Sequence, residues 1–105
     1  MFDLNELTVV AYENASRREA KDGAVSTDTI QMLKHTATEV VEATEAYSKI
    51  ASAEDDKQIE HFASELADIV CCVLIIAGKE GLDMEKALTC CMEKNYYRSV
   101  GKGDK

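Results

Sequence analysis

The chain of 105 residues contains no proline and no tryptophan, and only two phenylalanines and four tyrosines. Its five glycines lie at positions 23, 78, 81, 101 and 103. No stretch alternates β-branched and polar residues for the length of a strand, which excludes a sheet protein. Apolar residues recur instead at helical spacing between the glycines. We therefore expect a single all-α domain spanning residues 1–105.

Basic residues are also scarce, with 12 Lys and Arg against 20 Asp and Glu and a formal charge of −8. Nucleic-acid-binding proteins need clustered Lys and Arg to neutralise phosphates, so we expect no nucleic-acid polymer as a partner. The longest apolar run, residues 69–77, is far shorter than a membrane span, and no signal pattern opens the chain. We expect a cytoplasmic protein that does not bind membranes.

The four cysteines form two adjacent pairs, Cys71-Cys72 and Cys90-Cys91, in segments that otherwise read as helix. Neighbours on a helix diverge by about 100°, so neither pair can chelate one metal ion. We expect these cysteines to be small, buried apolar residues in a reducing compartment, because free cysteine is among the most buried residue types.

Capping residues predict where three of four helices begin, and the turn at residues 23–26 leads into the remaining one. Asp3 is followed by Glu6 three positions later, Ser52 and Asp55 resemble a capping box, and Asp83 is a good N-cap. Gly23 and the glycines at 78 and 81 can end helices. The expected helices span residues 3–22, 27–50, 52–79 and 83–98, followed by a flexible tail at 99–105.

Each expected helix has an apolar stripe that we predict to face the core of a four-helix bundle. The stripes consist of Leu4, Leu7, Ala11 and Ala15; Ile30, Leu33, Ala37, Val40, Val41, Thr44 and Tyr47; Ile59, Phe62, Leu66, Ile69, Val70, Val73 and Ala77; and Met84, Ala87, Leu88, Cys91 and Met92. From residue 69 to 77 the third helix is apolar on every side, which a helix tolerates only when it is surrounded. We therefore expect this helix to form a subunit interface in a homodimer or homotetramer.

The acids of two motifs, Glu39-Val-Val-Glu42 and Glu65-Leu-Ala-Asp68, do not lie on these apolar stripes. Residues three apart project from the same side of a helix, so each motif offers two carboxylates to one point. No Lys or Arg lies four residues after any of the four acids. Either they are ordinary solvent-facing carboxylates, or the two pairs converge on a divalent cation such as Mg²⁺ or Mn²⁺, which prefers oxygen ligands.

A di-iron carboxylate site is disfavoured. Such a site uses a Glu three residues before each His. Met32 and Gln58 occupy those places before His35 and His61. We expect both histidines to lie on polar helix faces.

The ordered set of motifs resembles the MazG-like all-α nucleoside triphosphate pyrophosphohydrolases. The matching segments are "MLKHTATEVVEATEAY", "HFASELADIVCCVLIIAGKEGLDMEKAL" and "MEKNYYR". The resemblance implies a Mg²⁺-dependent hydrolase that cleaves a nucleoside triphosphate between the α- and β-phosphates, releasing a monophosphate and pyrophosphate. It implies Glu39, Glu42, Glu65 and Asp68 as metal ligands, and Lys94, Asn95 and Arg98 as phosphate-binding residues.

In the mechanism that this resemblance implies, Glu39 or Glu42 deprotonates the attacking water, and the metal offsets charge on the phosphates. The chain departs from the family pattern at Thr38, where a further Glu is common, and near Cys91, where a Lys is common. The first departure bears on the number of metal ions and the identity of the base. The second bears on phosphate binding.

Base recognition is left open by the sequence. Tyr12, Phe62, Tyr96 and Tyr97 are candidates for stacking but fit a core role better, and Asn14, Arg17 and Arg18 are polar candidates. Three alternatives also stay open: a phosphoribosyl-ATP pyrophosphatase, a non-catalytic helical module that binds nucleotides or partners, and an acidic helical bundle without a site.

Overall fold

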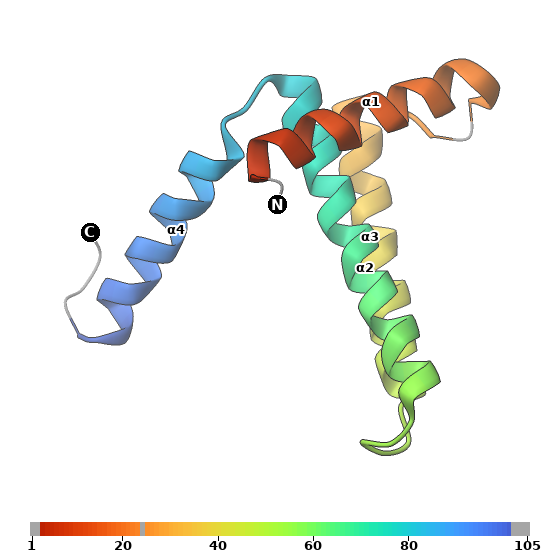
Figure 1. The fold of residues 1–105 in the computed structure, drawn as a ribbon, viewed down its shortest axis with the longest axis vertical. Coiled ribbons are helices and arrows are strands. Elements are labelled where there is room, and N and C mark those ends of the chain that lie inside the picture. The colour runs from red at the N-terminus through yellow and green to blue at the C-terminus, as the bar shows by residue number, and fades with distance from the viewer. Residues whose placement is uncertain (1–2, 24, 102–105) are drawn as a thin grey trace.

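The computed structural model describes residues 3–23 and 25–101, and within these ranges it contains four helices and no strand (Figure 1). The all-α prediction is confirmed. The helices are α1 (Leu4–Asp22), α2 (Thr29–Ser48), α3 (Asp56–Glu80) and α4 (Met84–Ser99). In the expected tail, Ser99 is still helical and residues 102–105 lie outside the described part of the chain.

Side-chain caps fix three of the helix starts. Asp3 accepts a hydrogen bond from the backbone N–H of Glu6 at 2.8 Å, and Asp83 accepts one from Lys86 at 3.0 Å, as predicted. The second helix begins two residues later than expected because Asp28 is its cap. Gly81, with φ +66°, adopts the left-handed conformation that ends α3.

The capping box predicted at Ser52 is wrong. The Ser52 hydroxyl accepts from the N–H of Glu54, and the Asp55 carboxylate accepts from the N–H of Ala51 at 3.2 Å. These bonds close a turn, because Ser and Asp side chains compete with helical backbone bonding. Consequently α3 starts only at Asp56.

The four helices form an open arrangement rather than a closed bundle within one chain. Helices α2 and α3 lie antiparallel and side by side, α1 crosses one end of this pair, and α4 runs away from it after packing against α1 (Figure 1). The radius of gyration is 16.4 Å. A compact chain of this length would have a value of about 13 Å.

Polar contacts hold both ends of α1. The Asn5 amide donates to Asp83 at 3.0 Å, which ties the start of α1 to the start of α4. Glu19, near the end of α1, accepts from both the N–H and the hydroxyl of Thr27. These two bonds lower the pKa of Glu19 and hold α1 against the segment that leads into α2.

The buried core is small, and it differs from the predicted stripes. The buried apolar residues are Ala15, Met32, Ala43, Ala46, Cys72, Leu74 and Ala77. Helix α4 contributes none, and of the four cysteines only Cys72 is buried. On α2, every residue of the predicted stripe is exposed. The predictions of inward stripes on α2 and α4 and of four buried cysteines are therefore wrong for a single chain. The apolar periodicity predicts which face of a helix is apolar, but it does not predict what packs against that face.

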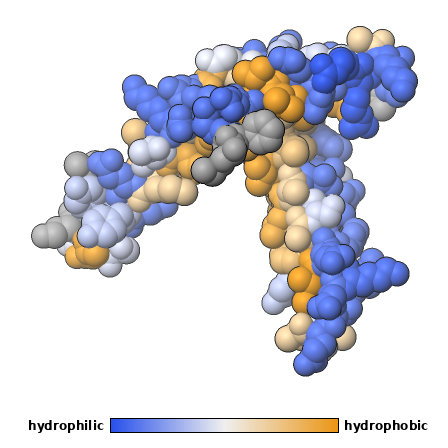
Figure 2. Space-filling view, viewed as in Figure 1, coloured by the Kyte–Doolittle hydropathy of each residue, from blue (hydrophilic) through white to orange (hydrophobic). Residues whose placement is uncertain are grey.

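Large apolar side chains remain exposed in a regular pattern. On α2 they recur every seven residues, and on α3 a second series has the same spacing. Their members are Leu33 (53% exposed), Val40 (48%), Tyr47 (64%), Ile59 (37%), Leu66 (44%) and Val73 (37%). We call these six residues the heptad face. Figure 2 shows hydrophobic side chains along the side of the α2–α3 pair that looks toward α4.

Helix α3 is also long and apolar enough to cross a membrane, judged by length and composition alone. Only 17% of its most apolar window of 18 residues is buried within the chain. Every such window of α3 contains Glu65 and Asp68. Ionised carboxylates are costly in a hydrocarbon layer, so these two acids argue for cover by protein rather than lipid.

Gly78 lets α1 cross α3 closely. A Cβ atom at this position would stand 2.5 Å from the Cβ of Tyr12 and 3.2 Å from the carbonyl oxygen of Thr8. We predict that Gly78→Ala lowers the free energy of unfolding by about 1–3 kcal/mol, as overpacking does. Urea denaturation would measure the loss. Ser64→Ala, at an exposed position of the same helix, should stay within about 0.5 kcal/mol of the parent. Equal stability of both variants would contradict the close crossing.

Candidate metal site and adjoining cavity

Three of the predicted acids converge. Glu39 and Glu42 from α2 and Glu65 from α3 each offer a carboxylate oxygen, and these oxygens lie within 4.8 Å of one another. We call these residues the acidic cluster. Glu39 is buried, Glu65 is half-buried and Glu42 is exposed. Asp68 does not join the group that meets this distance, although its charge acts on Glu39 and it lines the cavity beside it.

The cluster forms because α2 turns small residues toward α3. Ala43 and Ala46 are buried on the side of α2 that also holds Met32 and Glu39. Such small side chains let two helices approach closely. The acids are off the large apolar stripe, as predicted, but that side of the helix faces its neighbour rather than solvent. The interpretation of all four acids as ordinary surface carboxylates does not apply to Glu39.

Two carboxylate oxygens of the cluster are buried. Oε2 of Glu39 and Oε2 of Glu65 are buried and accept no hydrogen bond among the described residues. Buried polar atoms are nearly always bonded, and a buried anionic oxygen without a donor is costly. A divalent cation is the ligand that this donor set fits, because hard cations prefer several carboxylate oxygens.

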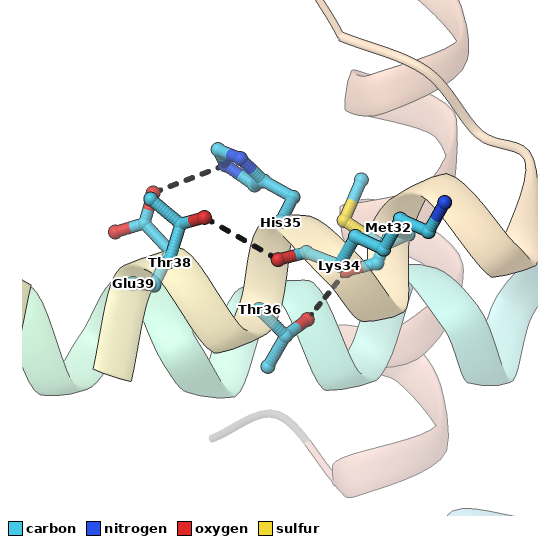
Figure 3. Close-up of polar contacts among 6 residues, drawn as sticks. All are labelled: Met32, Lys34, His35, Thr36, Thr38 and Glu39. Atoms are coloured by element: carbon cyan, nitrogen blue, oxygen red, sulfur yellow. Dashed lines mark hydrogen bonds and ion pairs between the residues drawn. The ribbon is translucent and has the colours of Figure 1, made fainter. Parts of the chain in front are cut away.

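The other oxygen of each of these glutamates meets a histidine. Nε2 of His35 lies 3.0 Å from Oε1 of Glu39, and Nε2 of His61 lies 3.6 Å from Oε1 of Glu65. Figure 3 shows the His35 ring reaching along α2 to Glu39. Both histidines are half-exposed on polar faces, as expected, but sequence reasoning missed their contacts. The signal was present, since each His precedes its Glu by four residues.

Burial is the main cause that raises the pKa of Glu39 above its ordinary value of 4.5, followed by the negative charge of Glu42. The Asp68 carboxylate acts in the same direction, while His35 opposes it. Thr38, where the family pattern often has a further Glu, bonds its hydroxyl to the carbonyl oxygen of Lys34 at 3.4 Å (Figure 3). It therefore adds no charge beside the cluster.

The predicted phosphate-binding residues lie on α4. Lys94 is half-buried, Asn95 and Arg98 are exposed, and the Asn95 amide donates to Sγ of Cys91 at 3.9 Å. Because α4 runs away from the α2–α3 pair (Figure 1), a single chain does not bring these residues to the acidic cluster.

A cavity of about 470 Å³ adjoins the cluster and is lined by residues of α1, α2 and α3. Glu39, Asp68 and His35 lie on it, as do Asn14 and Arg18 of α1. The aromatic candidates for base stacking do not line it. Tyr12 packs against Gly78, Phe62 lies 5.3 Å from Tyr47 between ring centroids, and Tyr96 and Tyr97 lie 5.6 Å apart.

A family model described as the MazG nucleotide pyrophosphohydrolase domain matches residues 27–100. This range is more than two thirds of the chain and contains both acidic motifs, Lys94, Asn95 and Arg98. Helix α1 lies outside it. No curated protein and no solved structure matches the chain.

The raised pKa of Glu39 predicts a pH-dependent effect of Glu39→Gln in metal-free protein. As the pH rises through 4.5, the unfolded chain releases this proton before the folded chain does, so the parent loses stability until the native pKa is passed. Glutamine does not ionise. The variant should therefore gain stability relative to the parent as the pH rises through this window.

Chemical denaturation with a chelator present, from about pH 4 to about pH 8, would measure this difference. Glu45→Gln, at an exposed position of the same helix, controls for the loss of one negative charge. A difference between Glu39→Gln and the parent that does not change with pH would contradict the assignment.

Proposed function

Because the chain belongs to the MazG nucleotide pyrophosphohydrolase family, we propose that it is a Mg²⁺-dependent nucleoside triphosphate pyrophosphohydrolase that releases a monophosphate and pyrophosphate. Family membership supports nucleotide pyrophosphohydrolase activity in general. The observation that supports the metal-dependent reaction is the acidic cluster, in which two buried carboxylate oxygens accept no hydrogen bond from the residues that the structure describes. Mn²⁺ is a second candidate ion, because it accepts the same ligands.

In this proposal Glu39, Glu42, Glu65 and Asp68 hold the metal, which supplies positive charge to polarise the phosphates. The side chains of the protein orient the carboxylates and accept the proton of the attacking water. Glu39 is oriented by His35 and Glu65 by His61, so each carboxylate keeps one oxygen for the site. Glu42 and Glu39 are the candidate general bases for the attacking water. Glu42 is exposed and can pass its proton to bulk water.

We further propose that two copies pair through the heptad face. Apolar residues repeated every seven positions on an antiparallel helix pair are the pattern of a four-helix bundle, and two α2–α3 pairs would supply the four helices. The bundle expected from the sequence would then form between chains. In such a dimer, Lys94, Asn95 and Arg98 of one chain would reach the acidic cluster of the other, which its own α4 does not approach. A homotetramer is the larger assembly with the same pairing.

The enzymatic proposal predicts that the protein releases pyrophosphate from nucleoside triphosphates when Mg²⁺ is present. A chelator that removes Mg²⁺ should abolish this release. Glu42→Ala should lower kcat by about 100-fold or more, the range for loss of a general base. Coupled detection of pyrophosphate across a panel of ribo- and deoxyribonucleotides would measure both. Glu45→Ala, three residues further along α2, is the matched control and should keep parental activity. Unchanged turnover by a folded Glu42→Ala protein would refute the site.

The same assay separates the alternatives. Turnover of phosphoribosyl-ATP in preference to every triphosphate would identify a phosphoribosyl-ATP pyrophosphatase. Tight nucleotide binding without pyrophosphate release would identify a non-catalytic module. A melting temperature that Mg²⁺ and Mn²⁺ leave unchanged would identify a bundle without a metal site, since a ligand selective for the folded state must raise it.

The pairing proposal predicts a dimer, or a tetramer, in analytical ultracentrifugation. Leu33→Lys places a charge on the heptad face and should yield monomers that no longer release pyrophosphate, because the partner's α4 is lost. Glu45→Lys adds a lysine on another face of α2 and should leave the assembly intact. A fully active monomer would exclude a site shared between chains.

A further inference from the structure

The cavity beside the acidic cluster has walls of opposite chemistry. Helices α2 and α3 contribute the carboxylates of Glu39 and Asp68, whereas α1 contributes Asn14 and Arg18. These two residues are four positions apart and therefore share one face of α1. Small residues of the same helix, Ala11 and Ala15, also line the space.

The wall formed by α1 is rich in hydrogen-bond donors. The Arg18 guanidinium has five N–H donors and no acceptor. The Asn14 side chain adds an NH₂ group, and its oxygen accepts a bond from the Arg17 guanidinium. His35 of α2 also lines the cavity, and its Nε2 lies 3.0 Å from Oε1 of Glu39.

Among the purines, this polarity matches those with an oxygen at position 6. Guanine presents two adjacent acceptors, O6 and N7, which arginine binds in a bidentate manner. Adenine presents N7 beside an N6 amino donor, which would face other donors on this wall. The volume of about 470 Å³ lies within the range of about 300–1,000 Å³ found for small-molecule sites.

We infer that the cavity is the nucleobase site and that Arg18, assisted by Asn14, selects 6-oxopurine nucleotides, such as those of guanine and hypoxanthine, over adenine nucleotides. This inference rests on the proposed function, because the acidic cluster then places the phosphates and metal at the other wall. The selecting residues lie on α1, outside the range that the family model matches. Base preference is in this way a property of this chain's own first helix.

The test compares kcat/KM for GTP, ITP and ATP, which share sugar and triphosphate. The parent should favour GTP and ITP over ATP by about 10- to 100-fold, the discrimination of one good bidentate contact. Arg18→Met removes the donors from an exposed side chain and should lower kcat/KM for GTP and ITP by the same factor while leaving ATP nearly unchanged. Lys21→Met removes one positive charge from the same helix outside the cavity and should change none of the three.

Binding of GMP and AMP in the presence of Mg²⁺, followed by calorimetry, separates this inference from the proposed function. If no triphosphate is hydrolysed but GMP binds more tightly than AMP, and Arg18→Met removes this difference, the result supports the base site and contradicts the proposed reaction. If hydrolysis occurs without preference for GTP and ITP, the result supports the reaction and contradicts the base site. An equal loss for all three triphosphates in Arg18→Met would also overturn the inference, because it would make Arg18 a phosphate contact.

Discussion

Close packing of α2 against α3 holds three carboxylates near one another, where their negative charges repel. Their oxygens lie within 4.8 Å of one another across the contact between α2 and α3. Small residues on α2 permit that contact, and burial removes the water that would otherwise screen Glu39. His35 contacts one oxygen of Glu39 and His61 contacts one oxygen of Glu65, while the other oxygen of each glutamate accepts no hydrogen bond within residues 3–23 and 25–101. In the proposed function a divalent cation completes this arrangement, because hard cations prefer several carboxylate oxygens.

The large apolar residues of α2 and α3 lie on a different face from the acids. Within one chain this face is exposed. Exposure of so many apolar groups costs free energy, and a second copy of the same face is the simplest cover. In the proposals above, metal binding and association both follow from this one helix orientation. In the proposed dimer they also meet at one site, since α4 of each chain carries the candidate phosphate-binding residues away from its own acids.

Helix α1 has a separate part in this arrangement. It crosses α3 at Gly78, closes the cavity beside the acids and is held at both ends by Asn5 and Glu19. The family match covers the helices that hold the acids and leaves α1 out. In the proposals above, α2 and α3 carry the metal-dependent reaction that the family shares, and α1 sets the base preference of this chain. The donors on α1 are exposed residues whose exchange would not disturb the packing of the acids.

Features that depend on near neighbours in the chain could be predicted from the sequence. Helix caps at Asp3 and Asp83, the convergence of Glu39 with Glu42, and the family all follow from spacings within a few turns. The contact of His35 with Glu39 is equally local, because the two residues are four positions apart. Three features required the folded structure: the face of α2 that meets α3, the position of Asp68 outside the group of three acids, and the direction of α4 away from the α2–α3 pair. These features depend on which surface covers an apolar stripe, and periodicity along one helix contains no information about its partner.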